Sequence, residues 1–124
     1  MKGILYLLPT SLGNPDTAFT IPEGIRSKVK ETGAFIVENL RSARRYLKLL
    51  DPSIRIDQLV FHELNKHTPP EEIPAFLKEL LDGTDAAMIS EVGMPGIADP
   101  GASVVRLAHE QGIRVVPLTG PSSI

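Results

Sequence analysis

Five short apolar runs divide the chain, and patterns with helical spacing lie between them. The runs cover residues 4–8, 34–37, 58–62, 86–89 and 114–118. Each run is short and mostly apolar rather than alternating, which is typical of strands that are covered on both faces in a parallel sheet. The alternation of strands and helices predicts an α/β fold: a mostly parallel five-stranded sheet with helices on both faces, in three layers.

The helical patterns carry recognisable boundary signals. Spacing predicts helices over residues 22–31 and 39–50, and a further helix is predicted with Asp99 as its N-cap and Pro100 as its first residue. Thr68 and Glu71 have the spacing of a capping box, which predicts a further helix that Gly83 closes. Because Pro74 cannot donate a backbone hydrogen bond, we expect this helix to start later or to have an irregular first turn.

The stretch 90–101 is rich in glycine and proline and follows the fourth apolar run. Gly93, Gly96 and Gly101 allow unusual backbone dihedrals and the close approach of a ligand, and Glu91 supplies a carboxylate where the strand ends. In parallel α/β sheets ligands bind at loops beyond the carboxyl ends of the strands. These local features suit a ligand-binding loop, and they suit a capped loop without a ligand equally well.

A group of cations lies on one face of the helix predicted over 39–50. Arg41, Arg44, Arg45 and Lys48 recur at a spacing of three and four residues, with no acidic residue among them. Two interpretations stay open: a solvated helix face, or a contact with the phosphate backbone of a nucleic acid.

Composition limits the remaining function classes. The formal net charge of −2 does not indicate a nucleic-acid or acidic-lipid binder as a whole, and the absence of cysteine excludes disulfides and thiolate metal sites. His62 and His67 are five residues apart beside Glu63, which does not match the four-residue spacing of a helical zinc motif. We therefore predict no metal.

We find no apolar stretch long enough to span a membrane and no signal peptide, and we expect a cytoplasmic protein.

Five segments, which follow one another along the whole chain, have distinctive sequences. They are Pro9-Thr10-Ser11-Leu12-Gly13-Asn14, Glu38-Asn39-Leu40-Arg41, Phe61-His62-Glu63-Leu64-Asn65, Ser90-Glu91-Val92-Gly93-Met94-Pro95 with Ala98-Asp99-Pro100-Gly101, and Thr119-Gly120-Pro121-Ser122. Together these segments resemble the tetrapyrrole methylase superfamily of S-adenosylmethionine-dependent methyltransferases. Within it, the chain is similar to the branch that 2′-O-methylates a cytidine of small-subunit ribosomal RNA. Glu91, Met94 and Leu40 depart from the family pattern, which has Asp, Thr and Thr at these places.

The resemblance implies a two-domain enzyme of which this chain is the first domain. We expect residues 1–118 to form that domain and 119–124 to begin a linker to a second domain outside the sequence. The chain ends in a loop of turn residues, which suits a truncated chain. The resemblance also implies that S-adenosylmethionine binds in the cleft between the two domains and that the full-length protein is a homodimer. The isolated domain should then bind the methyl donor weakly and be inactive.

The resemblance also assigns roles to individual residues. Donor contacts are expected from Pro9, Gly13, Glu91, Gly93, Met94, Pro95, Ile97, Thr119, Gly120 and Pro121. Contacts with ribosomal RNA are expected from Arg41, Arg44, Arg45 and Lys66. A ribose hydroxyl acceptor must lose a proton, and Glu38, His62 and Glu91 are candidates for the base, with no choice among them.

Two other functions remain open from the sequence. The same fold acts on tetrapyrroles in part of the superfamily, although the arginine-rich helix favours RNA over a tetrapyrrole. A non-catalytic nucleotide-binding or dimerisation module of 124 residues is the other alternative.

Overall fold

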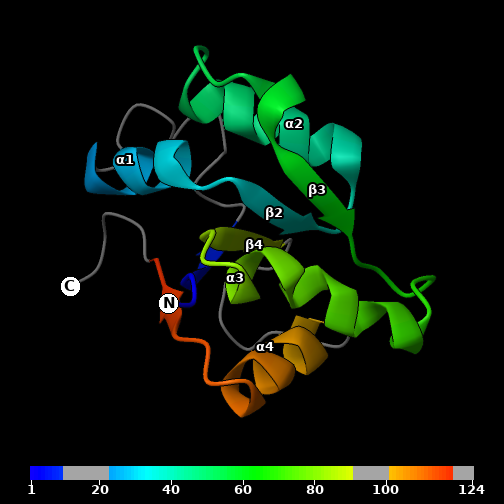
Figure 1. The fold of residues 1–124 in the computed structure, drawn as a ribbon. Helices are drawn as coiled ribbons and strands as arrows, with labels where there is room; N and C mark the ends of the chain where they lie inside the picture. Colours follow the sequence, from blue (N-terminus) through cyan, green and yellow to red (C-terminus); the bar gives the residue numbers. More distant parts are fainter. Residues whose placement is uncertain (10–22, 91–100, 119–124) are drawn as a thin grey trace.

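The strands form one parallel sheet at the centre of the molecule. A computed structural model of the chain describes residues 1–9, 23–90 and 101–118. The sheet has the order β3-β2-β4-β1-β5, and every pairing in it is parallel (Figure 1). The strands are β1 (Leu5–Pro9), β2 (Ala34–Val37), β3 (Val60–Glu63), β4 (Ala86–Ser90) and β5 (Val115–Pro117). This confirms the predicted five-stranded α/β sheet.

Helices cover both faces of the sheet, as predicted. One face carries α1 (Glu23–Glu31) and α2 (Leu40–Leu50), and the other carries the 3₁₀ helix η4 (Pro70–Leu77), α3 (Lys78–Leu81) and α4 (Gly101–Glu110) (Figure 1). A short 3₁₀ turn, η3 (Ile56–Gln58), lies between α2 and β3. The three layers follow from the chain order, because each crossover between parallel strands must return across one face.

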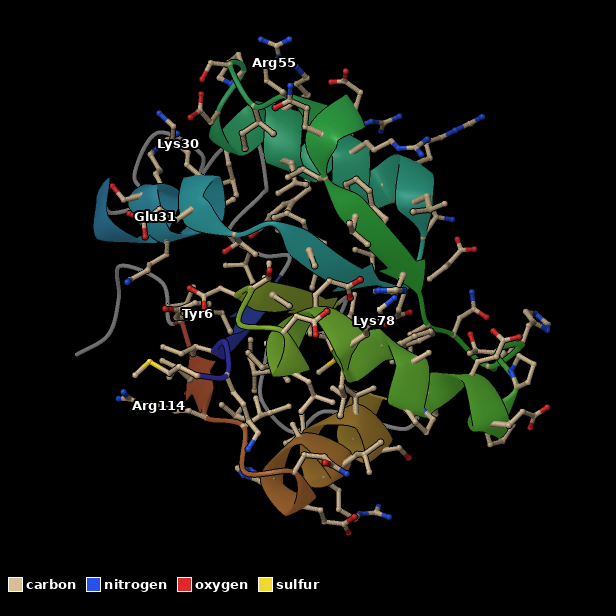
Figure 2. The ribbon with its side chains drawn as sticks, viewed as in Figure 1. Tyr6, Lys30, Glu31, Arg55, Lys78 and Arg114 are labelled. Atoms are coloured by element: carbon tan, nitrogen blue, oxygen red, sulfur yellow. The ribbon has the colours of Figure 1, made fainter. Side chains whose placement is uncertain are left out.

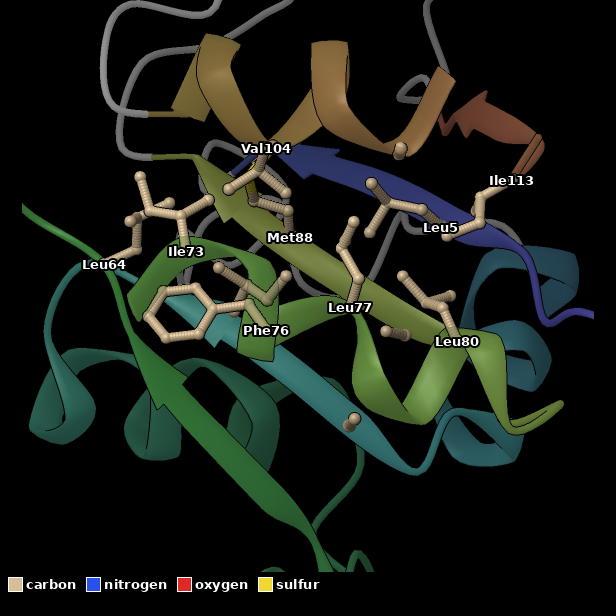
Figure 3. Close-up of a cluster of buried hydrophobic side chains, with 13 residues drawn as sticks. Leu5, Leu64, Ile73, Phe76, Leu77, Leu80, Met88, Val104 and Ile113 are labelled. Atoms are coloured by element: carbon tan, nitrogen blue, oxygen red, sulfur yellow. The ribbon is translucent and has the colours of Figure 1, made fainter. Parts of the chain in front are cut away.

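Alternate residues of the strands supply two separate hydrophobic cores. Tyr6, Leu8, Phe35 and Val37 face α1 and α2, where the buried residues of α2 meet them. Leu5 and Met88 face the opposite layer and pack against η4, α3 and α4, including Phe76 and Val104 (Figure 3). Because a strand side chain points to one face or the other in turn, continuously apolar strands are what this three-layer fold requires.

The segment before α3 differs from its expectation at its start. The Thr68 hydroxyl does not cap a helix: it donates to the carbonyl of Glu63 at 3.2 Å and accepts from the backbone N–H of Asn65 at 3.0 Å. The helix begins at Pro70 and stays 3₁₀ to Leu77, with Pro74 inside it. The predicted capping box is therefore wrong, and the irregularity predicted from Pro74 is confirmed.

Candidate functional site

Three of the predicted loops follow neighbouring strands at one edge of the sheet. The last residues of β1 and β4, Pro9 and Ser90, are register partners. On the other side of β1, the backbone N–H of Leu118, just after β5, donates to the carbonyl of Leu7 at 2.8 Å. The chain therefore enters residues 10–22, 91–100 and 119–124 from three adjacent positions at the carboxyl edge.

The neighbouring inner strands β1 and β4 are followed by helices on opposite faces of the sheet. After β1 the chain continues to α1 on one face, whereas after β4 it continues to α4 on the other. β1 and β4 are neighbours in the sheet, and the connections that leave them go to opposite faces. Such a switch point at the carboxyl edge is where open α/β sheets bind their ligands.

Most residues expected to contact the methyl donor follow this switch point in sequence but lie outside the described residues. They are Gly13, Glu91, Gly93, Met94, Pro95, Ile97, Thr119, Gly120 and Pro121. Pro9 is the exception, since it ends β1. The expected donor contacts therefore stay predictions.

Beside the switch point, the carboxyl ends of β2 and β3 are joined by hydrogen bonds. Asn39 caps α2 by accepting from the backbone N–H of Ser42 at 3.0 Å. A carboxylate oxygen of Glu63 accepts from the backbone N–H of Leu40 at 3.3 Å, and the side-chain amide of Asn65 donates to the carbonyl of Glu38 at 3.3 Å. These bonds fix the start of α2 at the carboxyl edge and leave the Glu38 side chain exposed.

His62 faces the opposite layer from α2. Its Nε2 lies 2.8 Å from a carboxylate oxygen of Glu79 in α3, and its ring stacks on Phe76 with ring centroids 5.0 Å apart. Both members of the pair are about four-fifths buried, at 21% and 22% side-chain exposure. A role for His62 as a base stays a prediction, and the partner in such a role is Glu79.

Tyr46 lies beneath the same edge, on the core side of α2. It borders a cavity of about 20 Å³ together with Glu38, Asn39 and Ile89. Burial raises the pKa of Tyr46, so its phenol stays protonated at neutral pH. The cavity is large enough for one water molecule and too small for a methyl donor.

The predicted cationic residues are on the surface. Arg41, Arg44 and Arg45 are exposed on α2, and Lys66 is exposed in the connection after β3. Among the residues that the structure describes, no ion pair joins any of these four to a carboxylate. The helix therefore presents uncompensated positive charge to solvent.

A groove next to α2 contains a cation that the sequence analysis missed. Its volume is about 750 Å³, and it is lined by Arg44, Lys48, Ser53, Ile54, Arg55, Ile56, Asp57, Leu59 and Phe61. Arg55 comes after the helix, and Figure 2 labels it above α2, at the top of the view. Helical spacing does not reach past Leu50, so only the path of the chain after α2 places Arg55 beside Arg44.

Two other kinds of feature are absent from the described part of the chain. No group of three or more His, Cys, Asp or Glu side chains there is arranged to hold a metal ion. No helix in residues 1–9, 23–90 and 101–118 is long and apolar enough to cross a membrane.

Comparison with known proteins gives a consistent set of relatives. The chain is 37% identical over 123 residues to a protein of Streptococcus pyogenes serotype M6 named "Ribosomal RNA small subunit methyltransferase I", covering 98% of this chain and 40% of that protein. Proteins with the same name from Halalkalibacterium halodurans and Bacillus subtilis are each 33% identical, covering 98% of this chain and 39% of their own length. No family model matches the chain. The chain therefore spans about 40% of the length of these relatives.

Proposed function

We propose that this chain, which belongs to the ribosomal RNA small subunit methyltransferase I family along the stretch it spans, is part of a methyltransferase that acts on small-subunit ribosomal RNA. The observation that carries the proposal is the switch point between β1 and β4, where β1, β4 and β5 end side by side and the chain enters the three segments that resemble the family. Since the chain spans about 40% of its relatives, a second domain is expected to complete the cleft.

The donor in this proposal is S-adenosylmethionine, held by the loops that follow β1, β4 and β5. When bound, it supplies a methyl group already activated by attachment to a sulfonium. The chain would then orient and enclose the donor. The proposed contacts come from Pro9 at the end of β1 and Gly13 after it, from Glu91 and Gly93 after β4, and from Gly120 after β5. Met94, Pro95, Ile97, Thr119 and Pro121 complete the proposed set. A carboxylate and close backbone carbonyls suit a positively charged ligand.

The proposed acceptor is a ribose 2′-hydroxyl, which loses a proton as its oxygen takes the methyl group. Glu38, His62 and Glu91 remain the candidate bases. Glu38 is exposed at the carboxyl edge beside the start of α2, which suits access to an RNA substrate. His62 would act with Glu79, whose carboxylate oxygen lies 2.8 Å from its Nε2 and orients its ring.

The RNA in this proposal contacts Arg41, Arg44, Arg45 and Lys66. Exposed cations without carboxylate partners among the described residues suit a phosphate backbone. This favours RNA over a tetrapyrrole, whose few carboxylates call for cations enclosed in a cleft. The remaining parts of the proposal are a homodimeric full-length protein and a cytoplasmic location, where ribosomal RNA is found.

The deciding experiment is mass spectrometry of small-subunit ribosomal RNA from a strain without the gene. We expect one 2′-O-methylated nucleotide to be lost and then restored by the full-length gene. A matched complementation with the full-length gene carrying Glu91→Ala should restore less methylation. An unchanged methylation pattern in the deletion strain contradicts the proposed function.

A further inference from the structure

The groove beside α2 combines positive charge with an apolar floor at the outer edge of the sheet. It lies between the second half of α2 and the segment that leads through η3 into β3, which is the outermost strand. Its lining includes three cations and one carboxylate, which are Arg44, Lys48, Arg55 and Asp57. The excess of cations favours an anionic occupant.

Lys48 holds the two sides of the groove together. Its ammonium group donates to the carbonyls of Pro52 at 3.2 Å and Ile54 at 2.8 Å. These bonds hold the chain after α2 against the helix end, and the next residue, Arg55, then lines the groove opposite the helix. Among the described residues, neither Arg44 nor Arg55 forms an ion pair, so no described carboxylate competes with an RNA phosphate or base for either guanidinium.

The floor of the groove is apolar, and the guanidinium that lies over it offers a flat surface for a base. The Phe61 ring stacks on Phe35 in the core, with centroids 5.7 Å apart and planes 25° apart. The guanidinium of Arg44 lies over the Phe61 ring, 5.8 Å from its centroid. Ile56 and Leu59 complete the apolar lining. Aromatic rings and guanidinium planes are the surfaces on which unpaired bases stack.

We infer that this groove binds an unpaired nucleotide of the RNA, with its phosphate at Arg55 and its base stacked on the Arg44 guanidinium, which the Phe61 ring supports from below. This rests on the proposed function and adds a subsite to it. A duplex exposes phosphates but keeps its bases stacked inside, so it would use the cations and leave the floor uncovered. An acidic protein segment has carboxylates and no stacking bases. The floor therefore selects single-stranded RNA.

The subsite lies along the same helix as the carboxyl edge. Arg41 is in the first turn of α2 and Lys48 in the last, and seven residues of helix span about 10 Å. Arg44 lies between them and lines the groove. An RNA strand that follows these cations passes from the groove to the edge where the proposed donor loops begin.

The test measures binding of labelled RNA to the full-length protein by fluorescence anisotropy. The probes are a non-self-complementary single strand of about ten nucleotides, a duplex of the same length, and heparin as a polyanion without bases. The variants are Arg55→Gln and Phe61→Leu. Arg114→Gln is the matched charge control, because Arg114 is exposed at the opposite end of the molecule (Figure 2). Thermal unfolding checks each variant's fold.

Each variant has its own expected signature. Phe61→Leu should weaken single-strand binding about tenfold, without changing its salt dependence or heparin binding. Arg55→Gln should weaken binding of all three probes and lower the salt slope for the single strand by roughly 0.7. Arg114→Gln should leave both properties as in the wild type.

The outcomes separate this subsite from the proposed function. If Arg55→Gln and Phe61→Leu bind single-stranded RNA as tightly as the wild type, the subsite is wrong even while methyl transfer to ribosomal RNA continues. Equal losses of single-strand and duplex binding in Phe61→Leu also overturn it, because stacking would then not contribute. If the wild type neither binds nor methylates RNA, both the subsite and the proposed function fail.

Discussion

Leu47→Ala, compared with Leu49→Ala two residues away, tests how α2 is held on the sheet. Leu47 is 0% exposed in the core beneath α2, whereas Leu49 is 37% exposed on the same helix. The substitution at Leu47 removes about 2.4 kcal/mol of transfer free energy, at 0.8 kcal/mol for each buried carbon group. With the cavity left behind, the expected loss of unfolding free energy is about 3 kcal/mol.

Leu49→Ala is the control, because the two substitutions differ only in whether the leucine side chain is buried. Leu49→Ala makes the same change in helix propensity and should cost less than about 1 kcal/mol. Urea unfolding of the chain, followed by circular dichroism, measures both. At a slope of about 2 kcal/mol/M, Leu47→Ala should lower the midpoint by about 1.5 M with the slope unchanged. Similar midpoints for the two variants would refute the packing assigned to α2.

Three further predictions concern the backbone, the buried phenol and the donor loop. Gly83→Ala should lower the free energy of unfolding by about 1 kcal/mol, because Gly83 has a φ of +100° and an added Cβ would lie 3.0 Å from the Met1 carbonyl oxygen. Gly24→Ala, in the first turn of α1 and with no described atom within 4 Å of the added Cβ, should instead raise it by up to about 1 kcal/mol in urea unfolding. Because burial raises the pKa of Tyr46, the folded state loses stability as pH rises above about 10, and Tyr46→Phe should flatten the stability profile between about pH 9 and 11. Glu91→Ala in the full-length protein should weaken S-adenosylmethionine binding severalfold by calorimetry, and unchanged affinity would contradict its proposed role.

Strand positions were predictable where the apolar runs are bounded by clear turn signals. β2 occupies 34–37 as predicted, and β4 extends one residue beyond its predicted run. β3 begins at Val60 rather than at Gln58, because Gln58 ends the 3₁₀ turn η3. Leu59 belongs to the apolar pattern yet precedes the strand. Hydrophobicity alone does not distinguish a turn that contains apolar residues from the start of a strand.

The capping box failed for a reason of tertiary structure. Thr68 has the spacing of an N-cap, but its hydroxyl bonds to Glu63 and Asn65 in the connection after β3. This holds the chain where β3 ends instead of starting a helix. The 3₁₀ geometry that follows agrees with Pro74, which cannot donate to the carbonyl four residues before it.

The segments that make up the candidate site could be predicted one by one from the sequence, but their positions relative to one another could not. Each loop carries its own turn residues, so its presence after a strand is local information. Their adjacency depends on β4 lying between β2 and β1, and strand order is set by packing across the whole sheet. Arg55 was missed for the same reason: its place beside Arg44 depends on the bonds from Lys48 to the chain beyond α2.

Helix α2 links the two halves of the proposed function. Its buried face, which includes Leu47, is fixed on the sheet, and Asn39 and Glu63 fix its first turn at the carboxyl edge. Its exposed face carries the cations that lead to the groove. A rigid helix anchored at both places sets the distance from an RNA phosphate in the groove to the edge where the methyl donor is proposed to bind. Substrate positioning and donor binding therefore depend on one packing interface, and a change that loosens α2 should reduce methyl transfer before it abolishes binding of either ligand.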